Sequence, residues 1–218
     1  MSERGRMSWA IVTAVALACA AGVLAPPAAR AQAIDRHLLD RLDPATGDEV
    51  WKIAETARQQ GVPYEPLLLT AAEGASKHAS RERILAAVRE RYAALSTAKD
   101  ALGPESTPSE IAAGAGALMS GVSPDTLAKL RQWRPKGSLL VPLVVLADLV
   151  TRHVPVETAS SALLHASRIG AKDADLLRLR SRIESDIQKG VSPAAATLSR
   201  LQGLGAGPPG APLPGGSR

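Results

Sequence analysis

Phenylalanine and asparagine are absent from the 218-residue sequence, and Cys19 is its one cysteine. A single thiol excludes a disulfide scaffold and a metal site built from several cysteines. Aromatic residues make up only 2% of the chain, so the side chains that stack on single-stranded nucleic acids are scarce. The charged fraction of 22% and the hydrophobic fraction of 45% are ordinary for globular proteins, which excludes a wholly disordered and a collagen-like chain.

Residues 1–33 have the pattern of an export signal peptide. Two arginines near the start precede an uncharged apolar stretch over residues 9–24, and small residues then recur at the spacing of signal cleavage sites. We therefore expect cleavage after Ala31 or Ala33 and a periplasmic or extracellular location. Two alternatives leave the protein anchored to a membrane, because the apolar stretch is just long enough to span one and Cys19 could carry a lipid.

Removal of the signal peptide changes what the charge of the chain implies. The formal net charge of +5 falls to +3, since 23 basic and 20 acidic residues follow residue 33. Nucleic-acid binding needs clustered cations, so no nucleic-acid partner is expected from this mild charge. Cleavage would also remove the one stretch long enough to span a membrane.

Residues 34–202 predict one helical domain without strands. Apolar residues recur at intervals of three and four, and convincing runs of alternating β-branched and polar residues are missing. The spacing predicts an all-α fold of about nine or ten short helices, the longest over roughly residues 81–101. Glycine and proline are the main components of residues 203–218, which we expect to form a disordered tail.

Several predicted helices have recognisable starts. Thr46 with Glu49, and Thr107 with Glu110, have the spacing of a capping box, and Asp173 is expected to open the last long helix. The run LLVPLVVLADLV, residues 139–150, is apolar almost all round and predicts the central buried helix. Its Asp148 is either solvated at one edge, the interpretation we favour, or paired with a nearby arginine.

A short corner motif recurs between the predicted helices. Its copies are Gly61-Val62-Pro63, Gly121-Val122-Ser123, His153-Val154-Pro155, Gly190-Val191-Ser192 and, more loosely, His78-Ala79-Ser80. The first residue ends one helix in the left-handed conformation, the valine covers that helix end, and Ser or Pro starts the next helix. Such Gly-Val-Ser/Pro corners predict an irregular bundle or a short solenoid-like stack. The intervals between Gly61, Gly121, His153 and Gly190 are 60, 32 and 37 residues. This unequal spacing favours the bundle, because a strict repeat keeps one period.

The common catalytic motifs are missing from the sequence. There is no HExxH, GxSxG or Walker A sequence. Ser96-Thr97-Ala98-Lys99 matches the SxxK pattern of penicillin-binding enzymes, but one companion motif is absent and Lys136-Gly137-Ser138 only loosely matches the other. His153 and His165 flank one predicted helix, too far apart to share a metal ion. We therefore predict no catalytic residue, no cofactor and no metal.

One resemblance covers most of the helical domain. The run GVPYEPLLLTAAEGASKHASRERILAAVRERY, together with GVSPDTL and LLVPLVVLADLV, resembles uncharacterised exported all-helical proteins of high-GC bacteria. The similarity extends over roughly residues 48–200. It implies export and an all-α fold, and it implies no site residue because no activity is attached to that group.

The expected function is that of a structural or protein-interaction module of the bacterial cell envelope. Trp51, Tyr64 and Trp133 are candidate contacts with an envelope protein or with a second copy, provided that they are exposed rather than buried in the core. Two alternatives stay open: a helical carrier of an apolar ligand, and a hydrolase-type enzyme whose site residues meet only in the folded chain.

Overall fold

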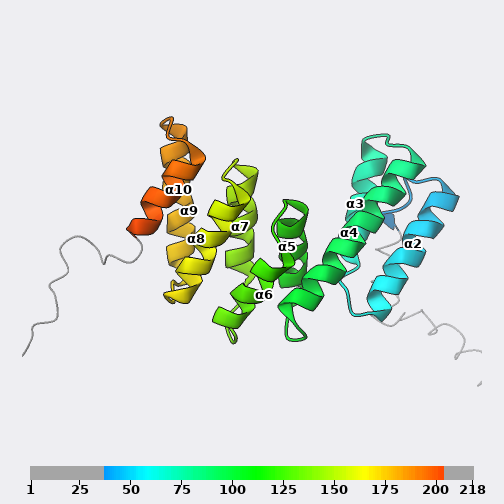
Figure 1. Ribbon diagram of the computed structural model, residues 1–218. Helices are drawn as coiled ribbons and strands as arrows, with labels where there is room; N and C mark the ends of the chain where they lie inside the picture. Colours follow the sequence, from blue (N-terminus) through cyan, green and yellow to red (C-terminus); the bar gives the residue numbers. More distant parts are fainter. Residues whose placement is uncertain (1–36, 204–218) are drawn as a thin grey trace, which may run out of the picture. The chain divides into compact units, whose positions relative to one another are not determined.

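The structure, a computed structural model, describes residues 37–203. Within that range the protein is all-helical, with nine helices and no strand, which confirms the predicted fold class. The helices are α2 (Pro44–Gln59), α3 (Glu65–Ser76), α4 (Arg81–Leu102), α5 (Pro108–Met119), α6 (Pro124–Trp133), α7 (Leu140–Thr151), α8 (Val156–Arg168), α9 (Asp173–Gln188) and α10 (Pro193–Gln202) (Figure 1). None of these nine combines the length and the apolar composition that crossing a membrane needs. The predictions for residues 1–33, with Cys19, Ala31 and Ala33, and for the tail from residue 204 onward concern residues outside this range.

All nine helices lie in the second of the two units into which the chain divides, which begins at Leu38. In this unit each helix packs mainly against helices one or two places away in the chain. α4, α6, α8 and α10 contact one another in succession, and so do α5, α7 and α9. The two rows are joined through α4 with α5, α7 with α8, and α9 with α10. This arrangement matches the solenoid-like stack, which is one of the two predicted alternatives.

The C-terminal part of the stack consists of three successive helix pairs, α5–α6, α7–α8 and α9–α10, each joined by a sharp corner and called a hairpin below. Because α5, α7 and α9 begin at residues 108, 140 and 173, the hairpins start 32 and 33 residues apart. Buried residues recur at the same offsets: Ile111, Leu143 and Leu176, then Gly114, Leu146 and Leu179. Of the two predicted alternatives, these regular offsets favour the solenoid-like stack. The corner spacing concealed the repeat because α9 has 16 residues, whereas α5 and α7 have 12 each.

The predicted corners have one shared backbone geometry. Their first residues have positive φ, at Gly61, His78, Gly121, His153 and Gly190, and so does Gly170 in a sixth corner. In each corner this residue donates its N–H to the carbonyl three residues back, and the next residue donates to the carbonyl five residues back. These paired bonds define the Schellman motif and satisfy carbonyls at the helix end. The sequence did not reveal the sixth corner, because alanine and lysine follow Gly170 in place of the template residues.

Two helix starts show how the capping residues compete. The structure confirms the capping box of α5, in which Glu110 donates its N–H to Thr107 Oγ1 at 3.2 Å and Thr107 donates its N–H to Glu110 Oε2 at 2.9 Å. The capping box at Thr46 was wrong. α2 begins earlier, at Pro44, and the Thr46 amide instead donates to Asp43 at 3.0 Å. Aspartate followed by proline at the first helical position is a strong start signal and prevails over threonine.

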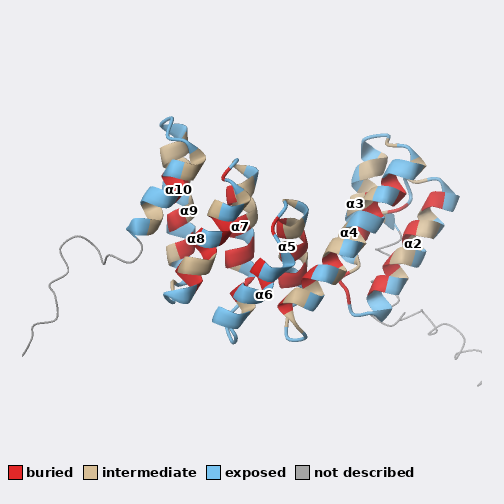
Figure 2. Ribbon diagram, in the orientation of Figure 1, coloured by how far each residue is buried: buried red, intermediate tan, exposed pale blue. Residues whose placement is uncertain are grey.

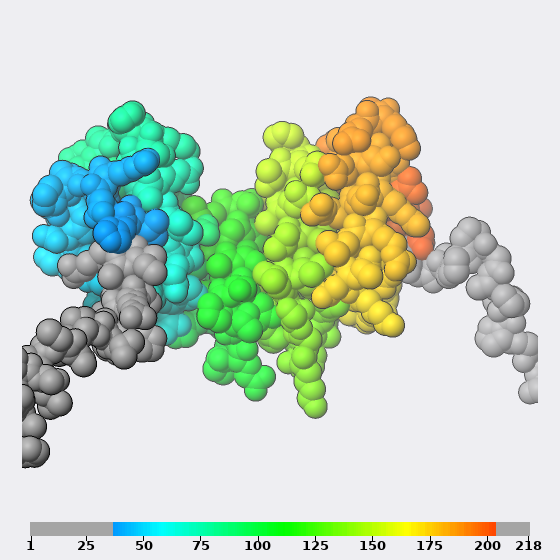
Figure 3. All heavy atoms as spheres, turned by 180° about the vertical axis from the view of Figure 1, so that it is seen from behind, coloured from blue at the N-terminus to red at the C-terminus, as the bar shows by residue number. Residues whose placement is uncertain are grey.

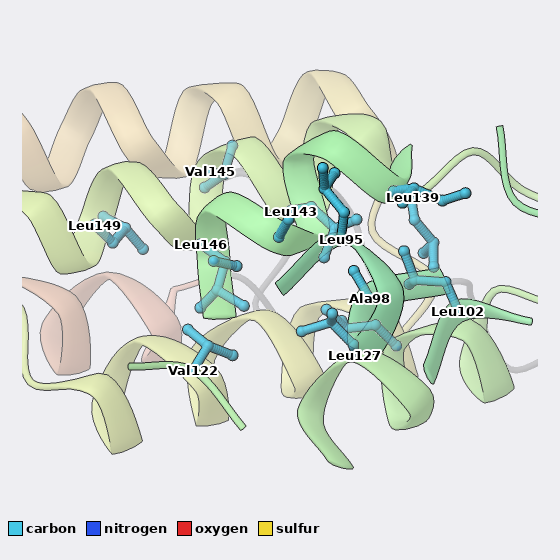
Figure 4. Close-up of a cluster of buried hydrophobic side chains, with 14 of the residues drawn as sticks. Leu95, Ala98, Leu102, Val122, Leu127, Leu139, Leu143, Val145, Leu146 and Leu149 are labelled. Atoms are coloured by element: carbon cyan, nitrogen blue, oxygen red, sulfur yellow. The ribbon is translucent and has the colours of Figure 1, made fainter. Parts of the chain in front are cut away.

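The core lies where the helices of the stack meet, as the buried positions in Figure 2 show. In Figure 4, side chains of α4 and α6 lie beside Leu143 and Leu146 of α7, so the core continues from one hairpin to the next. The predicted central buried helix, residues 139–150, is buried along part of its surface. Leu140 and Val144 of α7 are exposed, because the neighbouring helices cover only part of its surface.

Asp148 of α7 belongs to a network of charges between two hairpins. Its carboxylate lies 2.9 Å from Arg152 Nε and 3.6 Å from Arg180 Nε of α9. Arg152 also pairs with Glu184 of α9 at 2.9 Å. Asp148 is therefore paired with arginine rather than solvated at an edge, and the network links α7 to α9.

Candidate functional site

Three exposed apolar side chains lie on the α7–α9 side of the stack. Leu140, Val144 and Leu177 are 38%, 43% and 46% exposed, and we call them the apolar strip. Val144 and Leu177 are 33 residues apart and hold equivalent positions in successive hairpins, so they project from the same side. Packed helices lie about 8–10 Å apart, which sets the distance across the strip. In the view of Figure 3, α5, α7 and α9 follow one another from green through yellow-green to orange.

An open hollow of about 640 Å³ lies beside this strip. It is lined by the connection between α6 and α7, residues 134–138, and by residues 172–174 at the start of α9. Arg134 holds the two segments together, because its guanidinium lies 2.8 Å from Asp173 Oδ1 and donates to the carbonyl of Ala171 at 2.8 Å. The connection is therefore fixed against α9 by a hydrogen-bonded ion pair.

The lining of the hollow is cationic. Lys136 and Lys172 both line it, and within the part of the chain that the structure describes their ammonium groups form no ion pair. Segments 134–138 and 172–182 together carry six lysines and arginines and only two aspartates. Arg134, Arg178 and Arg180 pair with carboxylates, so Lys136 and Lys172 are the cations of the lining that attract anionic groups.

The buried carboxylate of Glu110 binds the backbone next to the residues that line the hollow. Glu110 is only 3% exposed, and its oxygens accept the N–H of Leu139 at 2.5 Å, the N–H of Thr107 at 2.9 Å and Arg131 Nη2 at 3.2 Å. Burial raises the pKa of Glu110, but these backbone hydrogen bonds and the positive charge of Arg131 outweigh it and hold the pKa below its ordinary value.

The partner of Glu110 extends the same network to the connection that lines the hollow. Arg131 of α6 also donates to the carbonyl of Leu102 at 3.2 Å and to that of Gly137 at 3.1 Å. Glu110 and Arg131 therefore join the end of α4, the start of α5 and residues 134–139. Every oxygen of the carboxylate is engaged, so the pair positions the connection and is not placed for acid–base chemistry.

The three aromatic candidates occupy different places. Trp133 is the last residue of α6, 37% exposed, and it directly precedes the lining residue Arg134. Trp51 in α2 and Tyr64 at the start of α3 are half-buried and pack against the core. The helices α2 and α3 pack against each other and against α4, whereas α6 packs against α4 and α8. Only Trp133 is therefore close to the hollow.

The residues considered for catalysis have structural roles. Lys99 of the SxxK sequence donates a hydrogen bond to the carbonyl of Gln60, at the end of α2. Among residues 37–203, no three His, Cys, Asp or Glu side chains are grouped so that they could hold a metal ion.

The sequence did not indicate the strip or the two lysines of the hollow. Leu140 and Val144 belong to a uniformly apolar run, in which hydropathy cannot separate exposed from buried positions. The equivalent positions of Val144 and Leu177 could have indicated the strip. That equivalence is recognised only once the 33-residue offset between successive hairpins is known. When compared with protein-family models, with curated proteins and with solved structures, the chain matches none of them. Its function is therefore inferred from its own residues.

Proposed function

We propose that this protein is an exported structural or protein-interaction module of the bacterial cell envelope, which binds another protein through the apolar strip. The observation that carries the proposal is the exposure of Leu140, Val144 and Leu177 on one side of the stack. Burying apolar surface is worth about 25 cal/mol per Å², so a partner that covers the strip gains affinity.

Two further features support this proposal. Stacked helical hairpins offer extended surfaces that many repeat proteins use for binding. Trp133 is exposed beside the same region, and tryptophan is enriched among the residues that contribute most to protein–protein affinity. Export rests on the signal-like pattern of residues 1–33 and on the resemblance to exported helical proteins.

No observation favours the carrier or the hydrolase to the same degree. A carrier of an apolar ligand needs an enclosed apolar cavity, whereas the hollow is open and has charged residues in its lining. A hydrolase needs a nucleophile with a base beside it in a cleft. Ser138 of the lining accepts the N–H of Leu140 at 3.2 Å, and the one carboxylate of the lining, that of Asp173, is paired with Arg134.

Affinity capture from the envelope fraction tests the proposal. The tagged full chain is compared with a Val144→Ser/Leu177→Ser double variant and with Leu69→Ser, which changes a leucine of α3 that is 57% exposed and outside the strip. The wild-type chain and the Leu69 variant should capture the same protein, and the double variant should capture about tenfold less of it. Equal capture by all three chains, or a monomeric protein that enriches no partner, would contradict the proposal.

A further inference from the structure

We infer that the hollow and the apolar strip form one binding site for an acidic peptide segment that carries apolar side chains, supplied by the partner protein. This inference rests on the proposed function and names the chemistry of the partner. The carboxylates of the segment would be bound by Lys136 and Lys172, and its apolar side chains would cover the strip.

The two parts of the site are continuous along the chain. Trp133 directly precedes the lining residues 134–138, and Leu140 follows them at the start of α7. On α9, Leu177 lies one turn beyond the lining residues 172–174, and a helical turn rises about 5.4 Å. A short extended segment can therefore reach the hollow and the strip at the same time.

The pairing of the charges favours carboxylates as the bound groups. Arg134 is already neutralised by Asp173 at 2.8 Å, which leaves the ammonium groups of Lys136 and Lys172 as the unpaired cations of the lining. On α9, Arg178 and Arg180 near Leu177 pair with Asp175 and Asp148, so the unpaired positive charge lies at the hollow. Unpaired cations beside an apolar patch favour a partner of the opposite sign and speed its association.

The same charges argue against two other occupants. The chain's own residues 204–218 contain no acidic side chain, so they lack the required complementarity. In a symmetric dimer the same surface of each copy would face its equivalent, which would bring the lysines of the two hollows together. A separate partner with an acidic segment avoids both conflicts.

Fluorescence polarisation with synthetic peptides tests the inference. The probe is a labelled peptide of about twelve residues with glutamates on both sides of two leucines, compared with matched peptides in which Gln replaces Glu or Ser replaces Leu. The full chain should bind the probe about tenfold more tightly than either matched peptide, and the affinity should fall as salt is added. Lys136→Glu/Lys172→Glu should bind about tenfold more weakly, whereas Lys52→Glu, on the exposed surface of α2, should bind like the wild type.

Several outcomes would overturn the inference. These are equal binding of the Gln peptide, unchanged binding by the double-lysine variant, or no binding of the acidic probe. Binding that requires deletion of residues 204–218 would assign the surface to the chain's own tail. A dimer that Val144→Ser/Leu177→Ser dissociates would assign it to a second copy. Envelope capture that depends on the strip but survives Lys136→Glu/Lys172→Glu would refute the acidic segment and leave the proposed function standing.

Discussion

Replacement of Glu110 by glutamine should destabilise the fold by about 2 kcal/mol near neutral pH, because a buried acceptor becomes a donor. The carboxylate accepts the Leu139 amide with one oxygen, and with the other it accepts the Thr107 amide and Arg131. Glutamine keeps one oxygen. If this oxygen retains the bond from Leu139, the NH₂ group of the glutamine faces two donors, the Thr107 amide and Arg131 Nη2. In the wild type Arg131 Nη2 lies 3.2 Å from Glu110 Oε2.

The expected cost follows from this geometry. A buried donor left without an acceptor costs about 1–3 kcal/mol. Arg131 keeps its bonds to the carbonyls of Leu102 and Gly137 but loses its counter-ion. Breaking a fully buried pair can cost about 3–5 kcal/mol, and the partial exposure of the arginine side chain places the expected value below that range.

The assay is urea unfolding followed by the helical circular dichroism signal, at several pH values from neutral to acidic. The pKa of Glu110 lies below its ordinary value in the folded protein, so its ionised form contributes stability that is complete above the unfolded pKa. This contribution is lost as the pH falls through the lower folded value. The difference between the wild type and Glu110→Gln should therefore shrink in acid.

The matched control is Glu157→Gln, the same substitution at an exposed position in the first turn of α8. It should leave the unfolding midpoint nearly unchanged, since surface substitutions away from special contacts have small effects. The reasoning fails if Glu110→Gln unfolds at the wild-type urea concentration near neutral pH. It also fails if the destabilisation stays constant down to acidic pH.

Two further predictions concern backbone positions, both measured by urea unfolding. A methyl group at Gly114 would lie 3.0 Å from Leu102 Cδ1 and 3.1 Å from Leu127 Cδ2, whereas at Gly116 it would meet no atom within 4 Å. Gly114→Ala should therefore destabilise the protein by about 1–3 kcal/mol through overpacking, and Gly116→Ala should stabilise it by about 0.5–1 kcal/mol; the reverse order would contradict the packing of α5. His153 has a φ of 64°, which strains any residue with a side chain, so His153→Gly should stabilise the protein by up to about 1 kcal/mol. If His153→Gly is less stable than His153→Ala, there is no such strain at this position.

Local features of the sequence were sufficient to predict much of the fold. The capping box of α5, the extent of α4 and five of the six corners follow from residues close together in the chain, because caps and Schellman motifs use contacts within one turn. The start of α2 was misplaced where two local signals competed. The solenoid-like stack was one of two predicted alternatives and was not singled out, since its period appears only when helix starts rather than corners are compared.

The candidate site was almost wholly hidden from the sequence. Trp133 was identified by its residue type, but Trp51 and Tyr64 share that type and pack against the core. Lys136 and Lys172 are separated by 35 residues and line the same hollow only because Arg134 binds Asp173 across it. No pattern within a single helix contains that information.

The sequence by itself determined an all-helical chain with sharp corners, because apolar periodicity and capping chemistry act over a few neighbouring residues. It also set the excess of basic over acidic residues and the scarcity of aromatic residues and cysteine. Only the tertiary structure decided which side chains of α7 and α9 remain exposed, and which cations lie beside them. Packing of α7 against α5, α8 and α9 buries most of an apolar helix but leaves Val144 uncovered, because flanking helices cannot enclose the outer face of a row.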